Sequence, residues 1–203
     1  MTGIILAGGK NTRIGTNKAF LKIEGRMIIE MILEKMGKIF EEIIMVTNFT
    51  EEYPPVLEAG QHLGVRLVKD IIPDESSLGG LYSGLVNSKG EYSFVVACDM
   101  PFINVELIKY MKNNCDNFDV VIPKLKYGYE ALHTIYSKNC ISPIEKQLKQ
   151  DNLKIIDFFP AVKVKEINEN IVKQFDPQLL SFFNINSDSD YQQALNIASS
   201  LRT

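Results

Sequence analysis

The sequence is poor in cysteine and histidine, has no run of basic residues, and lacks any apolar stretch near the roughly 20 residues of a membrane-spanning helix. Cys98, Cys115 and Cys140 are odd in number and widely spaced, so they form neither a disulfide framework nor a zinc pattern. Without a basic patch, the electrostatic footprint of a nucleic-acid-binding protein is missing. We expect no signal peptide, because the chain opens on an apolar, strand-like segment. These absences predict a protein of the reducing cytoplasm that binds neither membranes nor nucleic acids.

The two histidines, His62 and His133, form no recognisable Ser-His or Cys-His catalytic arrangement. The composition is otherwise that of an ordinary globular protein, with 45% apolar residues, 23% charged residues and a net charge of −3. A chain of 203 residues is long enough to bury a substantial core. We therefore expect residues 1–203 to form a single domain.

Short apolar segments of strand length alternate with segments of helical periodicity. The strands expected on this basis are residues 3–6, 43–46, 65–68, 92–97, 119–122, 131–136 and 162–167. The expected helices are residues 27–40, 79–86, 104–113, 141–150 and 188–200. Near-continuous apolar strands separated by helices are typical of a mostly parallel sheet covered on both faces. The predicted fold class is therefore α/β, with three layers and a central, mostly parallel sheet.

The first expected strand leads into a glycine-rich segment that also carries two cations, and it reads LAGGKNTRIGTNK from Leu6 to Lys18. Glycines let a backbone turn tightly and approach a ligand closely. The carboxyl end of a parallel strand is where open α/β sheets bind phosphates, and Arg13 and Lys18 add positive charge there. The segment predicts a nucleoside triphosphate site. A solvated glycine-rich turn is the weaker alternative, because it does not explain why the glycines and cations occur at this place and with this spacing.

Two commoner phosphate-binding motifs do not fit this segment. A P-loop requires Gly-x4-Gly-Lys-Ser/Thr, whereas five residues instead of four separate Gly9 from Gly15, and Thr16 stands where lysine is needed. The Gly8-Gly9 pair also lacks the spacing of the Rossmann fingerprint. The segment instead resembles the L-x-x-G-x-x-x-R-x-G-x-x-K signature of nucleotidyltransferases that activate sugars or cofactors with an NTP. The matching positions are Leu6, Gly9, Arg13, Gly15 and Lys18.

Asp99 follows the apolar run of residues 92–97, within the sequence Cys98-Asp99-Met100-Pro101. At the carboxyl end of a parallel strand, its carboxylate should face the same crevice as the first segment. Mg²⁺ prefers one or two carboxylates together with phosphates and waters. We favour this metal role over helix capping, because Asn104 is better placed to cap the helix that follows.

Three further positions have both a functional and a structural interpretation. Asp70 comes just after the expected strand 65–68, and Asn48 comes just after the expected strand 43–46, so each is a ligand or a turn residue. Gly79 belongs to a glycine pair that should precede a helix, whose first amides could meet an anion or a base edge.

The segment Phe183-Asn184-Ile185-Asn186-Ser187-Asp188 precedes the last expected helix. In an extended chain, Asn184 and Asn186 project from the same side and could meet one ligand or metal. Capping of the helix by Ser187 or Asp188 explains the same segment nearly as well.

The ordered set LAGG-xxx-RxGxxK, KD, LGGLYSGL, CDMP, EALHTIY and FFNINS resembles the molybdenum cofactor guanylyltransferases from Gly3 to Tyr191. The first element marks nucleotidyltransferases in general, while FxNxN and residues 130–136 favour the molybdopterin branch. The resemblance implies a Rossmann-like nucleotidyltransferase fold and transfer of GMP from GTP to the phosphate of molybdopterin, with release of pyrophosphate. Molybdoenzymes or other cofactor-biosynthesis proteins would be further partners.

The resemblance also assigns roles to residues, position by position. The residues implied to contact GTP are Leu6, Ala7, Gly8, Gly9, Lys18, Asn48, Asp70, Gly79 and Asp99. Arg13 and Lys18 would neutralise the triphosphate, and Asp99 would hold Mg²⁺. The acceptor side would be formed by His133, Asn184 and Asn186, although a structural histidine is an equally good interpretation.

The sequence departs from the family pattern at two places and leaves two other functions open. Ser76-Ser77 replaces a Gly-Pro pair and Ala131 replaces a proline, which bears on base and acceptor choice. A nucleotidyltransferase using CTP or a sugar or alditol phosphate would share the first segment and Asp99, but the FNIN element argues against it. A non-catalytic cofactor-binding protein would have less need of Arg13, Lys18 and Asp99 together.

Overall fold

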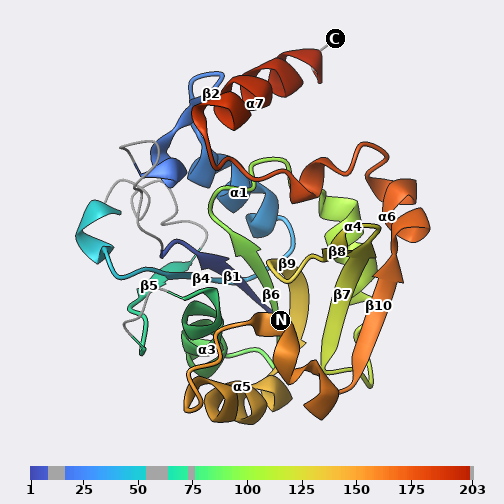
Figure 1. The fold of residues 1–203 in the computed structure, drawn as a ribbon. Coiled ribbons are helices and arrows are strands. Elements are labelled where there is room, and N and C mark those ends of the chain that lie inside the picture. The colour runs from blue at the N-terminus through green and yellow to red at the C-terminus, as the bar shows by residue number, and fades with distance from the viewer. Residues whose placement is uncertain (9–16, 54–63, 73–75, 202–203) are drawn as a thin grey trace.

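The computed structural model describes residues 1–8, 17–53, 64–72 and 76–201, and a sheet of eight strands runs through its centre (Figure 1). Seven strands lie in the order β10-β7-β9-β6-β1-β4-β5, and β8 pairs with β7. Gly9, Arg13 and His62 lie outside the described residues.

One half of the sheet is entirely parallel. It consists of β1 (Thr2–Leu6), β4 (Glu42–Val46), β5 (Val65–Val68) and β6 (Tyr92–Ala97). β1 pairs with β4 on one side and β6 on the other, with Leu6 opposite both Val46 and Ala97. Every residue of β1 is buried, as expected for a strand covered on both faces. The carboxyl ends of these strands therefore meet at one edge of the sheet.

The other half contains a strand that runs in the opposite direction. β9 (His133–Ser137) is antiparallel to β6 and to β7 (Val120–Leu125), and it lies between them. β8 (Gly128–Tyr129) is antiparallel to β7, while β10 (Val164–Asn168) is parallel to β7. Reversal of β9 brings its amino end, rather than its carboxyl end, beside the carboxyl end of β6.

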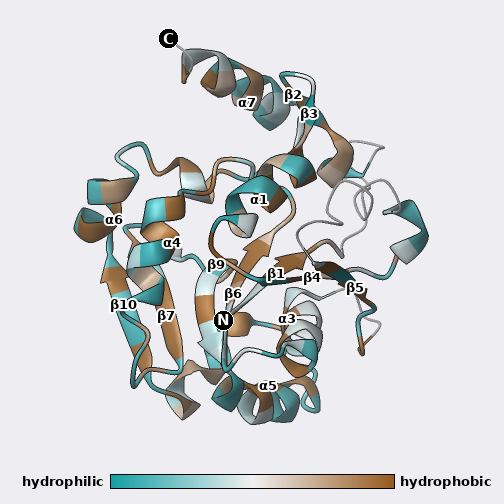
Figure 2. Cartoon of the chain, turned by 180° about the vertical axis from the view of Figure 1, so that it is seen from behind, coloured by the Kyte–Doolittle hydropathy of each residue, from teal (hydrophilic) through white to brown (hydrophobic). Residues whose placement is uncertain are grey.

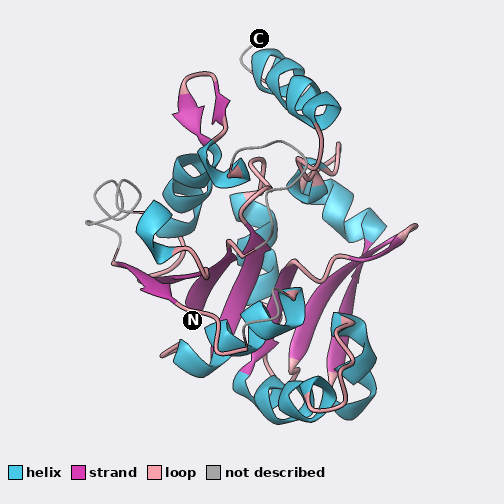
Figure 3. Ribbon diagram, turned by 60° about the vertical axis from the view of Figure 1, so that its left-hand side comes forward, coloured by secondary structure: helices cyan, strands magenta, loops and turns pink. Residues whose placement is uncertain are grey.

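Helices cover both faces of the sheet, so the molecule has three layers (Figure 3). One layer holds α1 (Ile28–Gly37), α4 (Val105–Lys112) and α6 (Glu169–Phe175), and α7 (Asp188–Ser200) extends beyond this layer and contacts the short strand β2 (Lys22–Ile23). The other holds α3 (Ser77–Asn87), α5 (Ile141–Leu148) and the 3₁₀-helix η5 (Ile155–Ala161). Successive strand residues alternate between the layers: Ile5 packs in the first core and Ile4 in the second. Figure 2 shows the resulting concentration of hydrophobic residues along the strands.

The α/β class and the mostly parallel sheet predicted from the sequence are confirmed. Each expected strand and helix is present, with bounds shifted by a few residues; the helix expected at 27–40, for example, ends at Gly37. The expectation that the glycine pair precedes a helix is wrong, because α3 begins at Ser77 and both glycines lie in its first turn. The sequence reading missed α6 and the short hairpin of β2 (Lys22–Ile23) and β3 (Arg26–Met27). Within the described ranges, no helix combines the length and apolarity needed to cross a bilayer.

Candidate active site

The parallel half of the sheet ends in a pocket, and backbone hydrogen bonds join the segments that leave its strands. The amide of Ala7 donates to the carbonyl of Val46 at 2.8 Å, and the amide of Cys98 donates to the carbonyl of Leu6 at 3.0 Å. The chain leaving β1 is therefore fixed between the ends of β4 and β6. This geometry holds Ala7 and Gly8 beside Asp99, as expected for the binding edge of an open α/β sheet.

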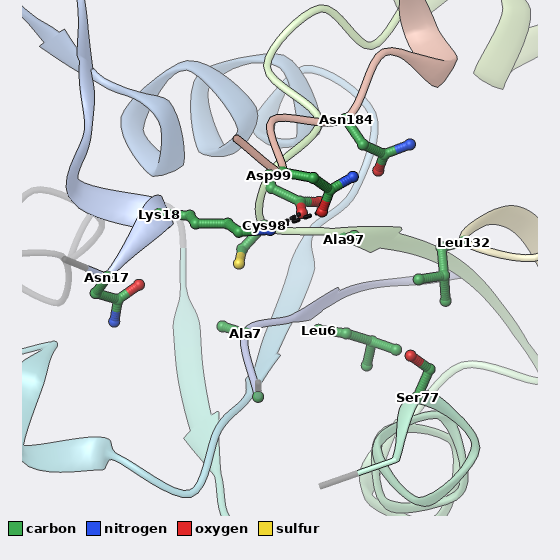
Figure 4. A pocket seen from close by; sticks show the side chains of 12 residues that line it. Leu6, Ala7, Asn17, Lys18, Ser77, Ala97, Cys98, Asp99, Leu132 and Asn184 are labelled. Atoms are coloured by element: carbon green, nitrogen blue, oxygen red, sulfur yellow. Dashed lines mark hydrogen bonds and ion pairs between the residues drawn. The ribbon is translucent and has the colours of Figure 1, made fainter. Parts of the chain in front are cut away.

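A cavity of about 260 Å³ lies at this edge, and we call it the central pocket (Figure 4). Its lining comes from the first segment, the end of β6, the start of α3, the residue before β9 and the C-terminal segment. The lining residues are Leu6, Ala7, Gly8, Asn17, Lys18, Ser77, Ala97, Cys98, Asp99, Leu132, Asn184 and Asn186.

Lys18 joins two distant parts of the chain inside the central pocket. Its Nζ lies 3.1 Å from Oδ2 of Asp99 and donates a 2.7 Å hydrogen bond to Oδ1 of Asn186. Only 20% of the lysine side chain and 16% of the aspartate side chain are exposed. The ammonium group is thus a largely shielded cation, held at a fixed position between β6 and the C-terminal segment.

Asn17 fixes the backbone that presents Lys18. Its Oδ1 accepts a hydrogen bond from the amide of Ala19 and so caps the short 3₁₀-helix η1 (Lys18–Phe20). Its Nδ2 donates to Tyr53 at 2.9 Å and to Glu52 at 2.7 Å. Asn17 therefore ties the start of η1 to the segment that follows β4.

The C-terminal segment caps α7, as one of its two interpretations predicts, and also brings its two asparagines to the central pocket. Ser187 caps α7 through the amide of Asp190, whose carboxylate accepts from the amides of Asn186 and Ser187. The amide of Ile185 donates to the carbonyl of Asp99 at 3.1 Å, which holds the segment against the end of β6. With the cap fixing its backbone, the segment brings the side chains of Asn184 and Asn186 to the central pocket.

A smaller pocket adjoins the central pocket on the side of β4 and β5, and we call it the side pocket. It is lined by Leu6, Gly8, Val46, Thr47, Asn48, Asp70, Ser76, Ser77 and Gly80. Asn48 and Asp70, each expected from its place after a parallel strand, therefore lie together. Gly79 does not line either pocket; its amide donates to Oγ of Ser76 at 2.9 Å, and Gly80 is the glycine that faces the side pocket.

The departure from the family pattern at Ser76-Ser77 preserves the start of α3. Ser76 is the N-cap residue and Ser77 is the first residue of the helix. Glycine is tolerated at the first of these positions and proline is favoured at the second, and serine is one of the best N-caps. The substitution therefore keeps the helix start and adds the hydroxyl of Ser77 to both pockets.

His133 lies in the hydrophobic core, which corrects the expectation that it faces the acceptor. Its side chain is fully buried, with its ring centroid 4.9 Å from that of Phe94 and 5.1 Å from that of Phe182. Neither ring nitrogen has a hydrogen-bond partner among the described residues. Burial lowers the pKa of His133 to about 3, so the ring is neutral near pH 7. Leu132, one residue earlier, lines the central pocket instead.

Asp99 is the candidate ligand for a divalent cation. No cluster of three or more His, Cys, Asp or Glu side chains occurs in the part of the chain that the structure describes. A single carboxylate with neighbouring amide oxygens suits a hard cation such as Mg²⁺, which takes its other ligands from phosphates and water. Burial, followed by the charge of Asp99, raises the pKa of the Cys98 thiol to about 12. Cys98 therefore stays protonated and does not offer a thiolate to a softer metal.

Five residues of the central pocket, Asn17, Ser77, Ala97, Cys98 and Leu132, were not predicted from the sequence. Asn17 had a usable signal, because an asparagine before a short helix is a favoured N-cap. Ser77 was noticed only as a departure from a pattern. Ala97, Cys98 and Leu132 carry no signal of their own, since each is an apolar or weakly polar residue close to one chosen for its chemistry.

Comparisons with known proteins show the family of this chain. The family model of the MobA-like NTP transferase domain matches residues 3–160. The chain is 39% identical to a probable molybdenum cofactor guanylyltransferase of Natranaerobius thermophilus, covering 96% of this chain and 94% of the relative. It is 34% identical to the molybdenum cofactor guanylyltransferase of Desulfosudis oleivorans, with the same two coverages of 96% and 94%.

Solved structures share the fold. Molybdopterin-guanine dinucleotide biosynthesis protein A from Archaeoglobus fulgidus superposes with a TM-score of 0.83 at 26% identity, covering 98% of this chain and 100% of that one. The 4-diphosphocytidyl-2C-methyl-D-erythritol synthase of Anaerococcus prevotii gives a TM-score of 0.73 at 19% identity, covering 100% and 96%, a likeness of fold alone.

Proposed function

The chain belongs to the family of the MobA-like NTP transferase domain, and on this premise we propose that it transfers GMP from GTP to the phosphate of molybdopterin, releasing pyrophosphate. The observation that carries the proposal is the meeting of three segments at one cation. Lys18 comes from the segment after β1, Asp99 from the end of β6 and Asn186 from the C-terminal FNIN element. The segment that we propose to bind the triphosphate and the FNIN element therefore line one pocket.

The reaction requires no activated side-chain nucleophile. An oxygen of the acceptor phosphate attacks the α-phosphorus of GTP, and the bond from that phosphorus to the bridging oxygen of pyrophosphate breaks. The attacking oxygen is already ionised near neutral pH, so a general base is unnecessary. The burial of His133 is consistent with this chemistry, because the mechanism assigns it no proton transfer. Catalysis then rests on positioning and on stabilisation of phosphate charge.

Lys18 supplies the positive charge of this site. Its shielded ammonium group would neutralise the triphosphate as charge moves toward the leaving pyrophosphate. Arg13 would add a second cation from the same segment. Asp99 would hold Mg²⁺, which when bound neutralises phosphate charge and orients phosphate oxygens. Gly8 leaves the backbone open to the phosphates, since a Cβ built there would have no neighbour within 4 Å among the described residues.

The two pockets suit the two ends of the reaction. Asn48 and Asp70 in the side pocket would receive the nucleoside, because they lie beyond Gly8 on the side of β4 and β5. Asn184 and Leu132 line the other end of the central pocket and would face the acceptor. In Figure 4, Asn184 and Ser77 lie on opposite sides of the cavity.

We assign the reaction to the cytoplasm, because Cys98, Cys115 and Cys140 are free thiols. Molybdoenzymes or other cofactor-biosynthesis proteins would receive the product there.

The test is incubation of the protein with molybdopterin, Mg²⁺ and one NTP at a time, followed by mass detection of the nucleotide adduct. The proposal predicts the guanine dinucleotide and one pyrophosphate per adduct. If none of the NTPs gives an adduct, although the folded protein binds molybdopterin under the same conditions, the protein is a cofactor-binding protein and not a transferase.

A further inference from the structure

Tyr53 is a fully buried tyrosine that lines neither pocket, yet its hydroxyl group contacts two segments that do. Nδ2 of Asn17 donates a 2.9 Å hydrogen bond to this hydroxyl, and Asn17 comes directly before Lys18. Thr47, which lines the side pocket, is a further hydrogen-bond partner of the same hydroxyl. One buried group therefore joins the segment that presents Lys18 to the segment that follows β4.

The side-chain amide of Asn17 has a partner at each of its polar positions, and this fixes its orientation. Its oxygen accepts from the amide of Ala19, while its Nδ2 donates to Tyr53 and to Glu52. Glu52 is exposed, so water can replace it as an acceptor. Tyr53 is buried, so the loss of its oxygen would leave an N–H group of Asn17 without an acceptor in a partly buried site. The hydroxyl of Tyr53 is thus the acceptor on which the position of Asn17 depends.

The ring of Tyr53 and its hydroxyl group have separate tasks. The ring packs against Phe20, the last residue of η1, with the two ring centroids 5.0 Å apart. Phenylalanine at position 53 would keep this packing and lose only the hydrogen bonds. Burial raises the pKa of the Tyr53 hydroxyl well above its usual range, so the group stays neutral and acts as a hydrogen-bond partner rather than as an acid or base.

Building on the proposed guanylyl transfer, we propose that Tyr53 is a positioning residue for the transfer step. Through Asn17, its hydroxyl holds the ammonium group of Lys18 where charge develops on the leaving pyrophosphate, and through Thr47 it fixes this place relative to the side pocket. Tyr53 itself touches no substrate. A cation stabilises a transition state best when it needs no rearrangement during the reaction, so a fixed Lys18 lowers the barrier more than a mobile one.

The first test is Tyr53→Phe, assayed for formation of the guanine dinucleotide at saturating GTP, molybdopterin and Mg²⁺. We expect kcat to fall about tenfold, as when one buried hydrogen bond is lost, while the KM for molybdopterin stays near wild type. Tyr136→Phe is the matched control, because Tyr136 is also fully buried and its hydroxyl donates a 2.8 Å hydrogen bond to the carbonyl of Ala131. Thermal unfolding should show a similar loss of stability in the two variants, with kcat near wild type in the control.

A second comparison separates positioning of Lys18 from a general effect on the fold. In the Lys18→Ala background, Tyr53→Phe should lower kcat no further, because the group through which it acts is already missing. A merely structural tyrosine would lower kcat by the same factor in both backgrounds. If Tyr53→Phe folds poorly, Asn17→Ala takes its place, since it breaks the same contact and should show the same dependence on Lys18.

Binding of inorganic pyrophosphate with Mg²⁺, measured by calorimetry, adds a readout that needs no turnover. We expect Tyr53→Phe to weaken this binding about tenfold, because pyrophosphate carries the charge of the leaving group, and Tyr136→Phe to leave it unchanged.

Two results would overturn the inference. One is a normal kcat in folded Tyr53→Phe. The other is an equal loss of kcat with and without Lys18, which would make the hydroxyl of Tyr53 a structural group only. Failure of the proposed function is distinguishable, because it shows as wild-type protein that makes no guanine dinucleotide, and calorimetry then still tests whether Tyr53 fixes Lys18.

Discussion

The two halves of the sheet end differently at the site edge, and the difference explains which residues can act there. In the parallel half, β1, β4, β5 and β6 all deliver their carboxyl ends to the pockets, and the residues that follow them are Ala7, Asn48, Asp70 and Asp99. In the other half, β9 delivers its amino end, so the contribution is Leu132 from the preceding loop. His133, the next residue, turns into the core because successive strand residues face opposite sides. The parallel half therefore supplies the residues of the proposed chemistry, and the other half supplies an apolar residue to the lining of the central pocket.

Asp99→Ala should have the largest effect on turnover. Removal of the carboxylate proposed to hold the metal should lower kcat about a thousandfold, since metal-assisted charge stabilisation is worth several kcal/mol. The fold should remain, because Asp99 lies at the pocket and not in the core. Steady-state turnover at saturating Mg²⁺ measures the effect, and thermal unfolding checks the fold. A near-normal rate would remove Asp99 from the mechanism.

Lys18→Ala should follow, with kcat/KM for GTP lower by about a hundredfold, because a shielded cation is lost from the triphosphate site. Lys22→Ala is the matched control, since Lys22 is an exposed lysine four residues later on β2. It should stay within about twofold of wild type, as is usual for exposed side chains. Equal losses in the two variants would show that the position of Lys18 in the signature has no special role.

Asn186→Ala should have a smaller effect, lowering kcat about tenfold, because the charged hydrogen bond that helps to hold the ammonium of Lys18 is lost. Asn184→Ala is the comparison, since the Nδ2 of Asn184 donates to the carbonyl of Phe182 instead. It should raise KM for molybdopterin and leave KM for GTP unchanged. A normal kcat in Asn186→Ala would show that the hydrogen bond from Lys18 to the C-terminal segment does not contribute to the catalytic step.

His133→Leu should leave turnover unchanged and alter stability instead. The native pKa of about 3 lies below the usual 6.5, so the unfolded chain binds a proton in a pH range where the folded chain does not. Stability contributed by the neutral ring is present above pH 6.5 and falls as the pH drops toward 3. Between pH 7 and pH 5 the wild type should lose about 2 kcal/mol of unfolding free energy through this group, and the variant should lose none of it.

Denaturant unfolding of both proteins at the two pH values measures this difference. An identical pH dependence would show that the ring has the same pKa in the folded and unfolded chain, and so that burial does not lower it. A loss of turnover in His133→Leu would show that His133 takes part in the reaction at the acceptor site. The residues that act would then come from both halves of the sheet.

The sequence predicts the parallel half of the molecule better than the other half. Continuous apolar runs mark β1, β4 and β6, and a polar residue directly after such a run is at the site edge whenever the strand is parallel. The direction of β9 has no such mark, because apolar and β-branched residues suit either direction. The placement of His133 consequently needed the structure. The hairpin of β2 and β3 was missed because two-residue strands are too short to show a period of two.

The site was predictable to the extent that strand ends determine it. Asp70, Asp99 and Asn48 were selected because each follows the carboxyl end of a parallel strand, and each lies at one of the two pockets for that reason. The bond from Lys18 to Asn186 joins residues 168 positions apart in the chain, and only the packing of the C-terminal segment against β6 creates it. Tyr53 is one more such case, since nothing in its local pattern shows that its hydroxyl reaches Asn17.

The most direct test of the account is a competition between GTP and CTP for one limiting pool of molybdopterin, with Mg²⁺ and wild-type protein, read by mass detection of the products. Equal concentrations of the two nucleotides make the product ratio equal to the ratio of kcat/KM values. The account predicts that the guanine dinucleotide dominates, because the carboxylate of Asp70, as we propose, would meet a base edge that donates hydrogen bonds. A dominant cytosine dinucleotide would contradict the guanylyl assignment and the role of Asp70, and would leave only the nucleotidyl transfer itself.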